Sequence, residues 1–442
     1  MRIAIIALEF PPYNSGGAYR PFRFASQLQQ NGVDIVVFSV NNYDKSGQWD
    51  QNSLLFKLPF KTIRSPLKTK HWSERFLKDY YFSLSERLGK YWRKSLRTEF
   101  AIEQELASFD NILVTAPPFS VLDEAFFLSK KYNIPLITDF RDAWSQWCIT
   151  PFSSRAHYIL TKRAELKILS HSSLFIVPTE EVGEDLIRVH GEKYKEKIFF
   201  LPNGFPENIR VNNIIDWKYE KGQKITIGYA GSFYFNPVSH NLIYRKWWQK
   251  KWYQYLQFVP RKENWLYRSP YFFFKGIRKL LDLYPEFLEK LEIRIAGKQP
   301  IWIYEMAKEL DLQKNVKFIG YVQKSEMDAF YKTCDLLLAT SIKIENGKDY
   351  CIGGKTYDYF MHQKPILGLV CEGAQKKILR DSGLALLCDP DKPDDLVQTI
   401  THIDEKVKKL KIDLEFLKNF EASNQVSQLL NRIMALKISN HS

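Results

Sequence analysis

Cysteine is scarce in this 442-residue sequence, and long apolar runs are missing. The five cysteines show no CxxC spacing, which argues against a disulfide framework or a zinc site and fits a reducing compartment. No apolar run approaches the roughly 18 residues that span a bilayer. Residues 1–17, MRIAIIALEFPPYNSGG, pass quickly from an apolar run into a Pro/Gly loop, so they indicate a first strand and not a signal peptide. We therefore expect a cytoplasmic protein.

Negative charge is also in short supply. The chain has 50 Asp and Glu against 64 Lys and Arg, for a net charge of +14. This excess favours a polyanionic neighbour, and composition leaves nucleic acid, acidic lipid and a phosphorylated substrate equally open. With 45% hydrophobic and 15% aromatic residues, the chain has ample material for packed cores. Its length predicts two domains of about 200 residues each.

Strand-like apolar runs recur along both halves of the chain, with helical stretches between them. In the first half they cover 2–8, 33–40, 111–115, 135–140, 174–178 and 197–201. In the second half they cover 224–230, 291–296, 316–321, 335–339, 365–370 and 384–388. Continuous runs of Ile, Val and Leu are typical of parallel strands that are buried on both faces. Two such sets predict two doubly wound domains, whose ligands lie at the carboxyl ends of the strands.

The segment Cys351–Val370, CIGGKTYDYFMHQKPILGLV, places two glycines and a lysine directly before a helix-like run. Glycines allow the backbone to approach a ligand closely, and the free N–H groups of a first helical turn attract anions. Because Lys355 adds a full positive charge, Gly353, Gly354 and Lys355 form a candidate phosphate or diphosphate site. The alternative is a plain turn with a solvated lysine, since the full P-loop spacing is missing.

Three further strand exits are candidates for ligand binding. Gly16 and Gly17 stand before an amphipathic helical run. The strand PLITDF leads to Arg141 and Asp142, and the strand KITIGYAG leads to Ser232. Plain alternatives exist at each place: a simple turn at the two glycine-containing exits, and structural ion pairs between Arg141 and the carboxylates next to it.

Taken in order, these segments resemble the retaining GT-B glycosyltransferases, specifically the GT4-like group (glycosyltransferase family 4, group 1) that builds bacterial surface glycans from nucleotide sugars. The matching stretches are FPPYNSGG, TAPPFSVL, ITDFRDAW, IVPTE, LPNG, IGYAGSFY, IRIAGK, VKFIGYV, CDLLLAT and GGKTYDYFMHQKPIL. The resemblance implies an α/β GT-B fold with two doubly wound Rossmann-like domains facing a central cleft. It implies an acceptor-binding domain over 1–205, a nucleotide-sugar-binding domain over 206–402, and a C-terminal helical segment over 403–442 that crosses back to the first domain.

The resemblance also assigns roles to individual residues. Asp142 and Arg141 lie where the family places polar groups near the reacting sugar, and they are the candidate catalytic residues. The donor-binding residues that it implies are Gly16 and Gly17 near the diphosphate, Gly231 and Ser232 at the start of the nucleotide site, Arg268 for the diphosphate, Tyr321 and Val322 for the base, Gly353, Gly354 and Lys355 for the phosphates, and Asp358 for the ribose.

The implied reaction moves a sugar from a nucleoside diphosphate sugar to a hydroxyl of a glycan or lipid-linked acceptor, with retention of configuration, in O-antigen, capsule or exopolysaccharide assembly. The nucleotide sugar is a co-substrate, so no cofactor is expected. No metal is expected either, since no carboxylate pair with DxD spacing lies at the expected site. Many relatives carry two glutamates separated by seven residues, where this chain has Tyr350 and Asp358. The missing first glutamate leaves open a catalytically inactive sugar-nucleotide-binding or scaffold subunit.

A basic aromatic insertion over about 236–267 interrupts the second domain. Glu263 is the only acid within 244–278, among many Lys, Arg, Trp and Tyr residues. Helical spacing would put Trp248, Trp252 and Tyr255 on one face, and a second stretch of this kind covers 57–97. Both suit contact with an anionic membrane at the inner face of the cell. The alternatives are a packed satellite core with snorkelling lysines, a subunit contact, or nucleic acid, which no accompanying motif supports.

Overall fold

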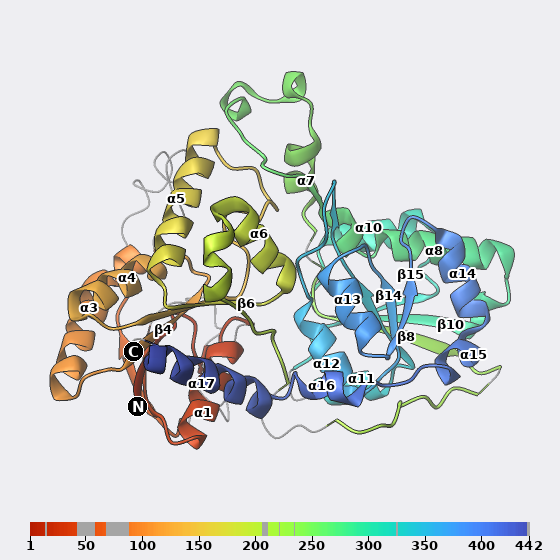
Figure 1. Ribbon diagram of the computed structural model, residues 1–442. Coiled ribbons are helices and arrows are strands. Elements are labelled where there is room, and N and C mark those ends of the chain that lie inside the picture. Colours follow the sequence, from red (N-terminus) through yellow and green to blue (C-terminus); the bar gives the residue numbers. More distant parts are fainter. Residues whose placement is uncertain are drawn as a thin grey trace. The chain divides into compact units, whose positions relative to one another are not determined.

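The computed structural model describes residues 1–13, 16–41, 58–67, 88–205, 211–220, 222–233, 235–323 and 326–439 (Figure 1). The chain divides into two compact units. Unit 1 comprises Met1–Asn208, Lys246–Pro260 and Glu421–Ser442, and unit 2 comprises Ile209–Arg245 and Arg261–Phe420. The middle of the basic insertion, which the sequence assigns to the second domain, therefore groups with unit 1.

Unit 1 is built on a seven-stranded parallel sheet in the order β3-β2-β1-β4-β5-β6-β7. The strands are β1 (Arg2–Ile6), β2 (Asp34–Val40), β3 (Lys61–Ser65), β4 (Asn111–Ala116), β5 (Leu136–Phe140), β6 (Leu174–Val177) and β7 (Ile198–Phe200). Ile5 at its centre pairs with Val37 on one side and Leu113 on the other. Every residue of β4, β5 and β6 is buried, as expected for strands that helices cover on both faces.

The helices of unit 1 flank this sheet. They are α1 (Tyr19–Gln30), α3 (Leu88–Leu106), α4 (Val121–Tyr132), α5 (Arg155–His171), α6 (Glu180–His190) and α17 (Ala422–Ser439). Figure 1 shows α17 beside α1, and both helices contribute to one apolar core with β1 and β2. The side-chain amide of Gln425 on α17 donates to the carbonyl oxygens of Pro202 and Asn203, each at 3.1 Å. The predicted return of the C-terminal helix to the N-terminal domain is confirmed.

Unit 2 contains a six-stranded parallel sheet in the order β11-β10-β8-β12-β14-β15. The strands are β8 (Ile225–Ala230), β10 (Leu291–Ala296), β11 (Val316–Gly320), β12 (Leu336–Thr340), β14 (Ile366–Leu369) and β15 (Ala385–Cys388). A separate antiparallel ribbon joins β9 (Glu263–Asn264) to β13 (Lys343–Ile344).

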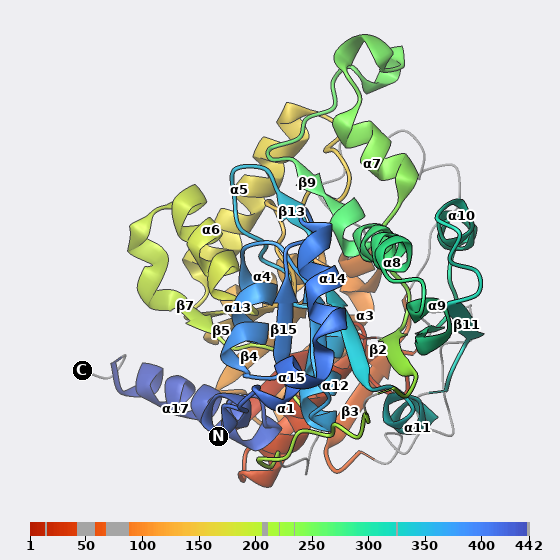
Figure 2. The ribbon, with the colours of Figure 1, turned by 90° about the vertical axis from the view of Figure 1, so that its right-hand side faces the viewer.

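The helices of unit 2 are α7 (Pro237–Tyr244), α8 (Tyr271–Leu283), α9 (Phe287–Lys290), α10 (Ile301–Glu309), α11 (Met327–Lys332), α12 (Gly354–His362), α13 (Ala374–Asp381), α14 (Pro393–Thr401), α15 (Ile403–Lys408) and α16 (Leu414–Lys418). Figure 2 shows α8 beside α14, and the two pack together through Ile277, Leu280 and Leu396 in the main core of the unit.

Both sheets follow the doubly wound pattern in which the strand order reverses beside the first strand. The reversal lies between β1 and β4 in unit 1 and between β8 and β12 in unit 2. Two Rossmann-like sheets were predicted from the sequence, and this is confirmed. Ligands of such sheets bind where the order reverses, at the carboxyl ends of the strands. Among the helices in the described part of the chain, none is long and apolar enough to cross a membrane.

The predicted helical face of the insertion is wrong. Trp248 and Trp252 lie in two separate 3-10 turns, Trp247–Gln249 and Trp252–Gln254, which follow α7. A glutamine closes each turn, because the side-chain oxygens of Gln249 and Gln254 accept from the backbone N–H of the residue that precedes the turn. These glutamine side-chain hydrogen bonds stabilise two short turns in place of one continuous helix.

The second basic aromatic stretch, 57–97, lies partly outside the described residues, since nothing is described at 57 and over 68–87. Within the described part, Trp92 on α3 is completely buried, and its indole N–H donates to the hydroxyl of Ser65 at 2.7 Å. Trp92 is therefore a core residue of unit 1, which contradicts a role for this indole at a membrane surface.

Candidate active site

Two cationic side chains, Lys355 and Arg268, lie at the start of α12 in the predicted site. Lys355, in the first turn of this helix, extends its side chain over Gly231 at the end of β8. A methyl group at Gly231 would lie 2.3 Å from Cε and 2.7 Å from Nζ of Lys355, and Gly231 has a φ of +97°. The ammonium group also lies 4.9 Å from the ring centroid of Tyr229. Gly231 is thus required both by its backbone conformation and by the space that the lysine occupies.

Arg268 lies beside the same loop. It ends a 3-10 turn, Trp265–Arg268, and a Cβ at Gly353 would stand 3.5 Å from its Nη2 atom. Burial and the neighbouring Arg268 guanidinium lower the pKa of Lys355 to about 8, while Asp358 opposes the shift. Two cations are thus held close together in a partly desolvated place. An anion bound between them would relieve their repulsion.

Gln375 holds the loop before α12 in place, while the space beside Gly354 is open. The N–H of Gly353 donates to Oε1 of Gln375 at 2.7 Å, and the amide of Gln375 donates to the hydroxyl of Thr356 at 2.9 Å. A Cβ at Gly354 would meet nothing within 4 Å. Within the described part of the chain, the N-cap Gly353 provides no side-chain cap for α12, so the N-terminus of this helix is suited to an anion.

Three glycines lie at the carboxyl ends of the neighbouring strands β8, β10 and β11, and each has a positive φ: Gly231 (+97°) and Gly297 (+107°) directly after β8 and β10, and Gly320 (+77°) as the last residue of β11. The N–H of Gly231 donates to the carbonyl of Ala296 at 2.7 Å, and that of Gly297 donates to the carbonyl of Gly320 at 2.6 Å. A Cβ at Gly297 would lie 2.9 Å from the backbone of Gly231. The strand ends therefore approach one another without side chains between them.

The remaining predicted donor residues of unit 2 lie around this edge. Ser232 is exposed, and its hydroxyl donates to the carbonyl of Lys298 at 2.7 Å. Tyr321 and Val322 follow Gly320, and Tyr321 is 68% exposed. Asp358 accepts a 3.4 Å hydrogen bond from the hydroxyl of Tyr331, whose pKa is raised by burial and by this carboxylate. Their contacts with a donor stay a prediction.

Tyr350, at the position of the missing glutamate, is bonded to a glutamate from elsewhere in the chain. Its hydroxyl donates to both carboxylate oxygens of Glu263, each at 3.1 Å. Glu263 is completely buried and also accepts from Nε of Arg261 at 2.9 Å and from the indole of Trp265 at 3.0 Å. Burial raises the pKa of Glu263, and the Arg261 guanidinium opposes this. The sequence showed one signal of this cluster, the single acid within a long basic stretch.

In unit 1, Gly17 and Arg141 lie together. A Cβ at Gly17 would stand 1.9 Å from both Nη1 of Arg141 and Oε2 of Glu9. Arg141 forms a 3.7 Å ion pair with Glu9, and its guanidinium donates to the carbonyl of Pro117. A side chain at Gly16, in contrast, would meet no atom of the described residues within 4 Å. The glycine loop after β1 thus packs on the loop that carries the candidate catalytic residues.

The alternative in which Arg141 pairs with the carboxylates next to it is wrong for Asp139. This buried carboxylate binds Arg20 of α1, whose Nη2 lies 2.8 Å from Oδ1, and it also accepts from the hydroxyl of Thr115 at 2.9 Å. Arg20 donates further to the carbonyl oxygens of Leu201 and Pro202. Asp139 therefore joins β5 to α1, and the partly exposed Asp142 stays the candidate for contact with substrate.

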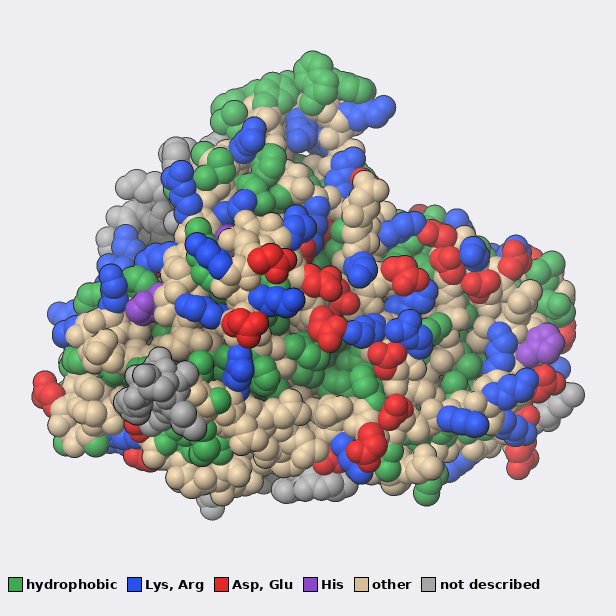
Figure 3. Space-filling view, in the orientation of Figure 1, with side chains coloured by type: hydrophobic (Ala, Val, Ile, Leu, Met, Phe, Trp, Pro, Cys, Tyr) green, Lys and Arg blue, Asp and Glu red, His purple; other side chains and the backbone are tan. Residues whose placement is uncertain are grey.

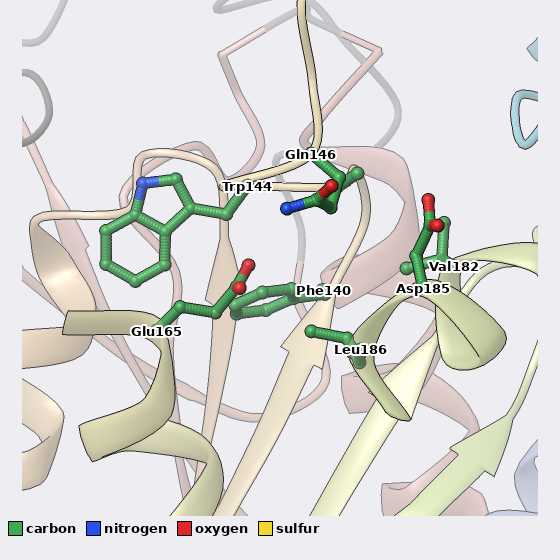
Figure 4. A pocket seen from close by; sticks show the side chains of 8 residues that line it. Phe140, Trp144, Gln146, Glu165, Val182, Asp185 and Leu186 are labelled. Carbon is green, nitrogen blue, oxygen red and sulfur yellow. The ribbon is translucent and has the colours of Figure 1, made fainter. Parts of the chain in front are cut away.

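A second buried carboxylate holds the other end of this loop. Glu165 on α5 accepts from the backbone N–H of Ser145 at 3.0 Å and from its hydroxyl at 2.6 Å. The imidazole of His190 lies 2.7 Å from the same carboxylate. Figure 4 shows Glu165 at a small pocket lined by Phe140 and Trp144. Because the carboxylate stands between the serine and the histidine, this is an anchor for the loop and not a nucleophile with its base.

Across the described ranges of the chain, no group of three or more His, Cys, Asp or Glu residues is placed to hold a metal ion.

Part of the sequence that contains this site matches a known protein family. Residues 267–405 match the model of the family described as "Glycosyl transferases group 1". The matched range contains Arg268, Gly353 and Lys355. No relative among the curated proteins matches the sequence.

Solved structures resemble nearly the whole chain. The lipopolysaccharide outer core galactosyltransferase WaaB, in its apo form, has a TM-score of 0.60 at 12% identity, covering 98% of this chain and 99% of that one. Anabaena HepE in complex with UDP and glucose has a TM-score of 0.59 at 14% identity, covering 98% and 100%. A putative UDP-N-acetylglucosamine 2-epimerase from Listeria monocytogenes has a TM-score of 0.51 at 10% identity, covering 98% and 96%.

These identities show the fold alone, and it is the GT-B fold that the sequence predicted. The epimerase shares this fold, so the fold does not by itself decide the reaction. The group 1 domain over 267–405 confirms the predicted enzyme class, a glycosyltransferase.

Proposed function

We propose that the chain transfers a sugar from a nucleoside diphosphate sugar to a hydroxyl of a glycan or lipid-linked acceptor, with retention of configuration. The proposed setting is the assembly of O-antigen, capsule or exopolysaccharide at the inner face of a bacterial cell membrane. The group 1 match and the UDP bound to Anabaena HepE support a nucleotide-sugar donor. The observation that carries the proposal is the position of Arg268 and Lys355 at the open first turn of α12.

These two cations suit the charge that develops during sugar transfer. As the glycosidic bond breaks, the sugar gains positive charge and the leaving diphosphate gains negative charge. Preorganised donors that meet this charge contribute about 3 kcal/mol each. Lys355 and Arg268 are already close enough to repel each other before the donor arrives, so a bound diphosphate would meet both charges. A pKa of about 8 leaves Lys355 mostly protonated at pH 7, and a bound diphosphate would raise that pKa.

The roles of unit 1 are part of the same proposal. Arg141 and Asp142 would orient hydroxyl groups of the reacting sugar or of the acceptor, and Gly16 and Gly17 would approach the diphosphate. The Glu9 and Pro117 contacts of Arg141, and the Glu165 contacts of Ser145, support a loop held in one conformation. The donor is a co-substrate in this reaction, which needs no separate cofactor.

A second candidate is a sugar-nucleotide-binding subunit without catalytic activity. The observation in its favour is Tyr350, which bonds to the buried Glu263 and offers no carboxylate at the position of the first glutamate. Donor binding is common to both candidates, and turnover distinguishes them.

Thermal unfolding in the presence of nucleotide sugars tests the donor site. One UDP- or GDP-linked sugar should raise the unfolding temperature of the full chain, and Lys355→Ala should remove that rise without lowering the temperature of the donor-free protein. Lys308→Ala is the control, because Lys308 is an exposed lysine on α10. A folded sample that responds to none of the nucleotide sugars contradicts the proposal.

A further inference from the structure

The insertion ends in a cluster of exposed aromatic side chains. We call residues 246–256 the aromatic tip. Trp247, Trp248 and Trp252 are 71%, 59% and 78% exposed, and Tyr255 and Leu256 are 57% and 67% exposed. Figure 3 shows hydrophobic side chains gathered at the end of this segment, with Lys and Arg side chains beside them. These exposures contradict the packed satellite core, in which the same indoles would be buried.

The local fold displays the indoles. The two 3-10 turns repeat a lysine, an aromatic pair and a glutamine, over 246–249 and 251–254. Each glutamine bonds back to the start of its own turn, at 3.1 and 3.0 Å, so each turn is closed without help from a neighbouring element. The tip therefore keeps its shape while its aromatic residues contact water.

The base of the tip is fixed to unit 1. Phe258 and Phe152 exchange two backbone hydrogen bonds, at 2.9 and 3.0 Å. The ring of Phe258 lies 5.0 Å from that of Tyr158 in the first turn of α5. Ile159 and Leu160, the next residues on that helix, are 41% and 39% exposed. The anchoring helix thus adds apolar surface of its own.

The charge of the tip itself has one sign. Residues 246–256 contain Lys246, Lys250 and Lys251 and no acid. Residues 155–164 of α5 contain Arg155, Lys162 and Arg163 and again no acid. The ammonium group of Lys246 lies 5.0 Å from the centre of the Trp248 ring, so cationic and aromatic groups alternate within the tip itself.

We propose that the aromatic tip binds the surface of a bilayer that contains anionic lipid. Tryptophan and tyrosine favour the headgroup region, where the ring is in contact with acyl chains and the polar atom is wet. Lysines are attracted to the negatively charged surface of an anionic leaflet. A protein partner would suit the indoles but not the uniform charge, and the combination of both favours lipid. This binding needs no donor, so it is measured independently of sugar transfer.

Vesicle flotation of the full-length chain tests the proposal. The vesicles contain phosphatidylcholine alone or a 3:1 mixture with phosphatidylglycerol, at low and at high salt. We expect the wild-type protein to bind the mixed vesicles at least tenfold more tightly than the neutral ones, with weaker binding at high salt. Replacing Lys246, Lys250 and Lys251 by Glu should lower this binding at least tenfold. Replacing Trp247, Trp248 and Trp252 by Ala should lower it on the mixed vesicles at both salt concentrations.

Matched controls exclude unspecific effects. Glu replacement of Lys308, Lys314 and Lys332, three exposed lysines of unit 2, changes the net charge equally. Ala replacement of Leu106, Ile214 and Ile301 removes equally exposed apolar side chains. Both control variants should bind within twofold of the wild type, and all variants should unfold at the same temperature.

Three results would overturn the proposal. The first is a wild-type protein that does not float with anionic vesicles. The second is binding that both tip variants retain. The third is a wild-type protein that does not bind vesicles but forms a dimer or a nucleic-acid complex through the tip. This result would assign the surface to a subunit contact or to nucleic acid.

Discussion

Replacing Gly231 by alanine separates the two reasons for glycine at the end of β8. The φ of +97° costs an L-residue roughly 1–2 kcal/mol, which corresponds to a fall of roughly 2–8 °C in unfolding temperature for a domain of this size. The new methyl group would also lie 2.3 Å from Cε of Lys355, closer than atoms can approach. Because the end of a lysine side chain is flexible, Lys355 would swing away instead of disrupting the fold. We therefore expect a modest loss of stability together with a large loss of donor affinity.

Gly222→Ala is the matched control. Gly222 has the same φ of +97°, but a Cβ there would meet nothing within 4 Å. It should lower the unfolding temperature by a similar amount and leave donor affinity unchanged. Titration calorimetry with the nucleotide sugar that stabilises the wild type measures the affinity. We expect a loss of at least tenfold for Gly231→Ala and less than twofold for Gly222→Ala.

A double variant decides whether the loss passes through Lys355. If the methyl group acts by displacing this side chain, adding Gly231→Ala to Lys355→Ala should weaken donor binding no further, since the two changes remove the same interaction. Additive losses in the double variant, or an unchanged affinity in Gly231→Ala alone, would refute the reasoning.

Four further predictions rest on single contacts. Gly17→Ala should destabilise unit 1, because its Cβ would stand 1.9 Å from both Arg141 and Glu9 and would separate these two largely buried side chains from their ion pair, whereas Gly16→Ala should leave the unfolding temperature unchanged. Donor affinity should fall as the pH rises above about 8, where Lys355 loses its proton, and a calorimetric pH series on Lys355→Arg should show no such fall. In the donor-free protein the same lowered pKa should make the unfolding free energy rise from pH 8 upwards, because the unfolded chain then binds more protons; Lys355→Met should abolish this rise in urea titrations. Tyr350→Phe should cost about 1–2 kcal/mol in urea unfolding, since the buried Glu263 carboxylate loses a donor.

The strands were predictable because parallel strands buried on both faces leave a strong signal. All twelve expected runs correspond to strands in the two parallel sheets, as the wholly buried β12 and β14 illustrate. The strand β3, KTIRS, was missed because it lies at the edge of its sheet, is only partly buried and carries polar residues. The start of α12 at Gly354 was also predictable, from the glycine pair and lysine that precede it.

Contacts between segments that are far apart in the chain could not be predicted from the sequence. Nothing in the local pattern shows that Lys355 lies over Gly231, or that Glu263 reaches Tyr350. The ion pair of Asp139 with Arg20 was hidden for the same reason, since an adjacent arginine offered a simpler partner. The tip was predicted as one helix because its aromatic residues have helical spacing, yet the glutamine side chains close two short turns there.

Turnover of the bound nucleotide sugar tests the proposed function most directly. The measurement is release of free nucleoside diphosphate from the nucleotide sugar that stabilises the protein, in the presence of glycan and lipid-linked hydroxyl acceptors. The proposal predicts acceptor-dependent release by the wild type, at least 30-fold slower in Lys355→Ala at an unchanged unfolding temperature. A well-folded wild-type protein that binds the donor and releases nothing with any acceptor would contradict sugar transfer and favour the inactive subunit.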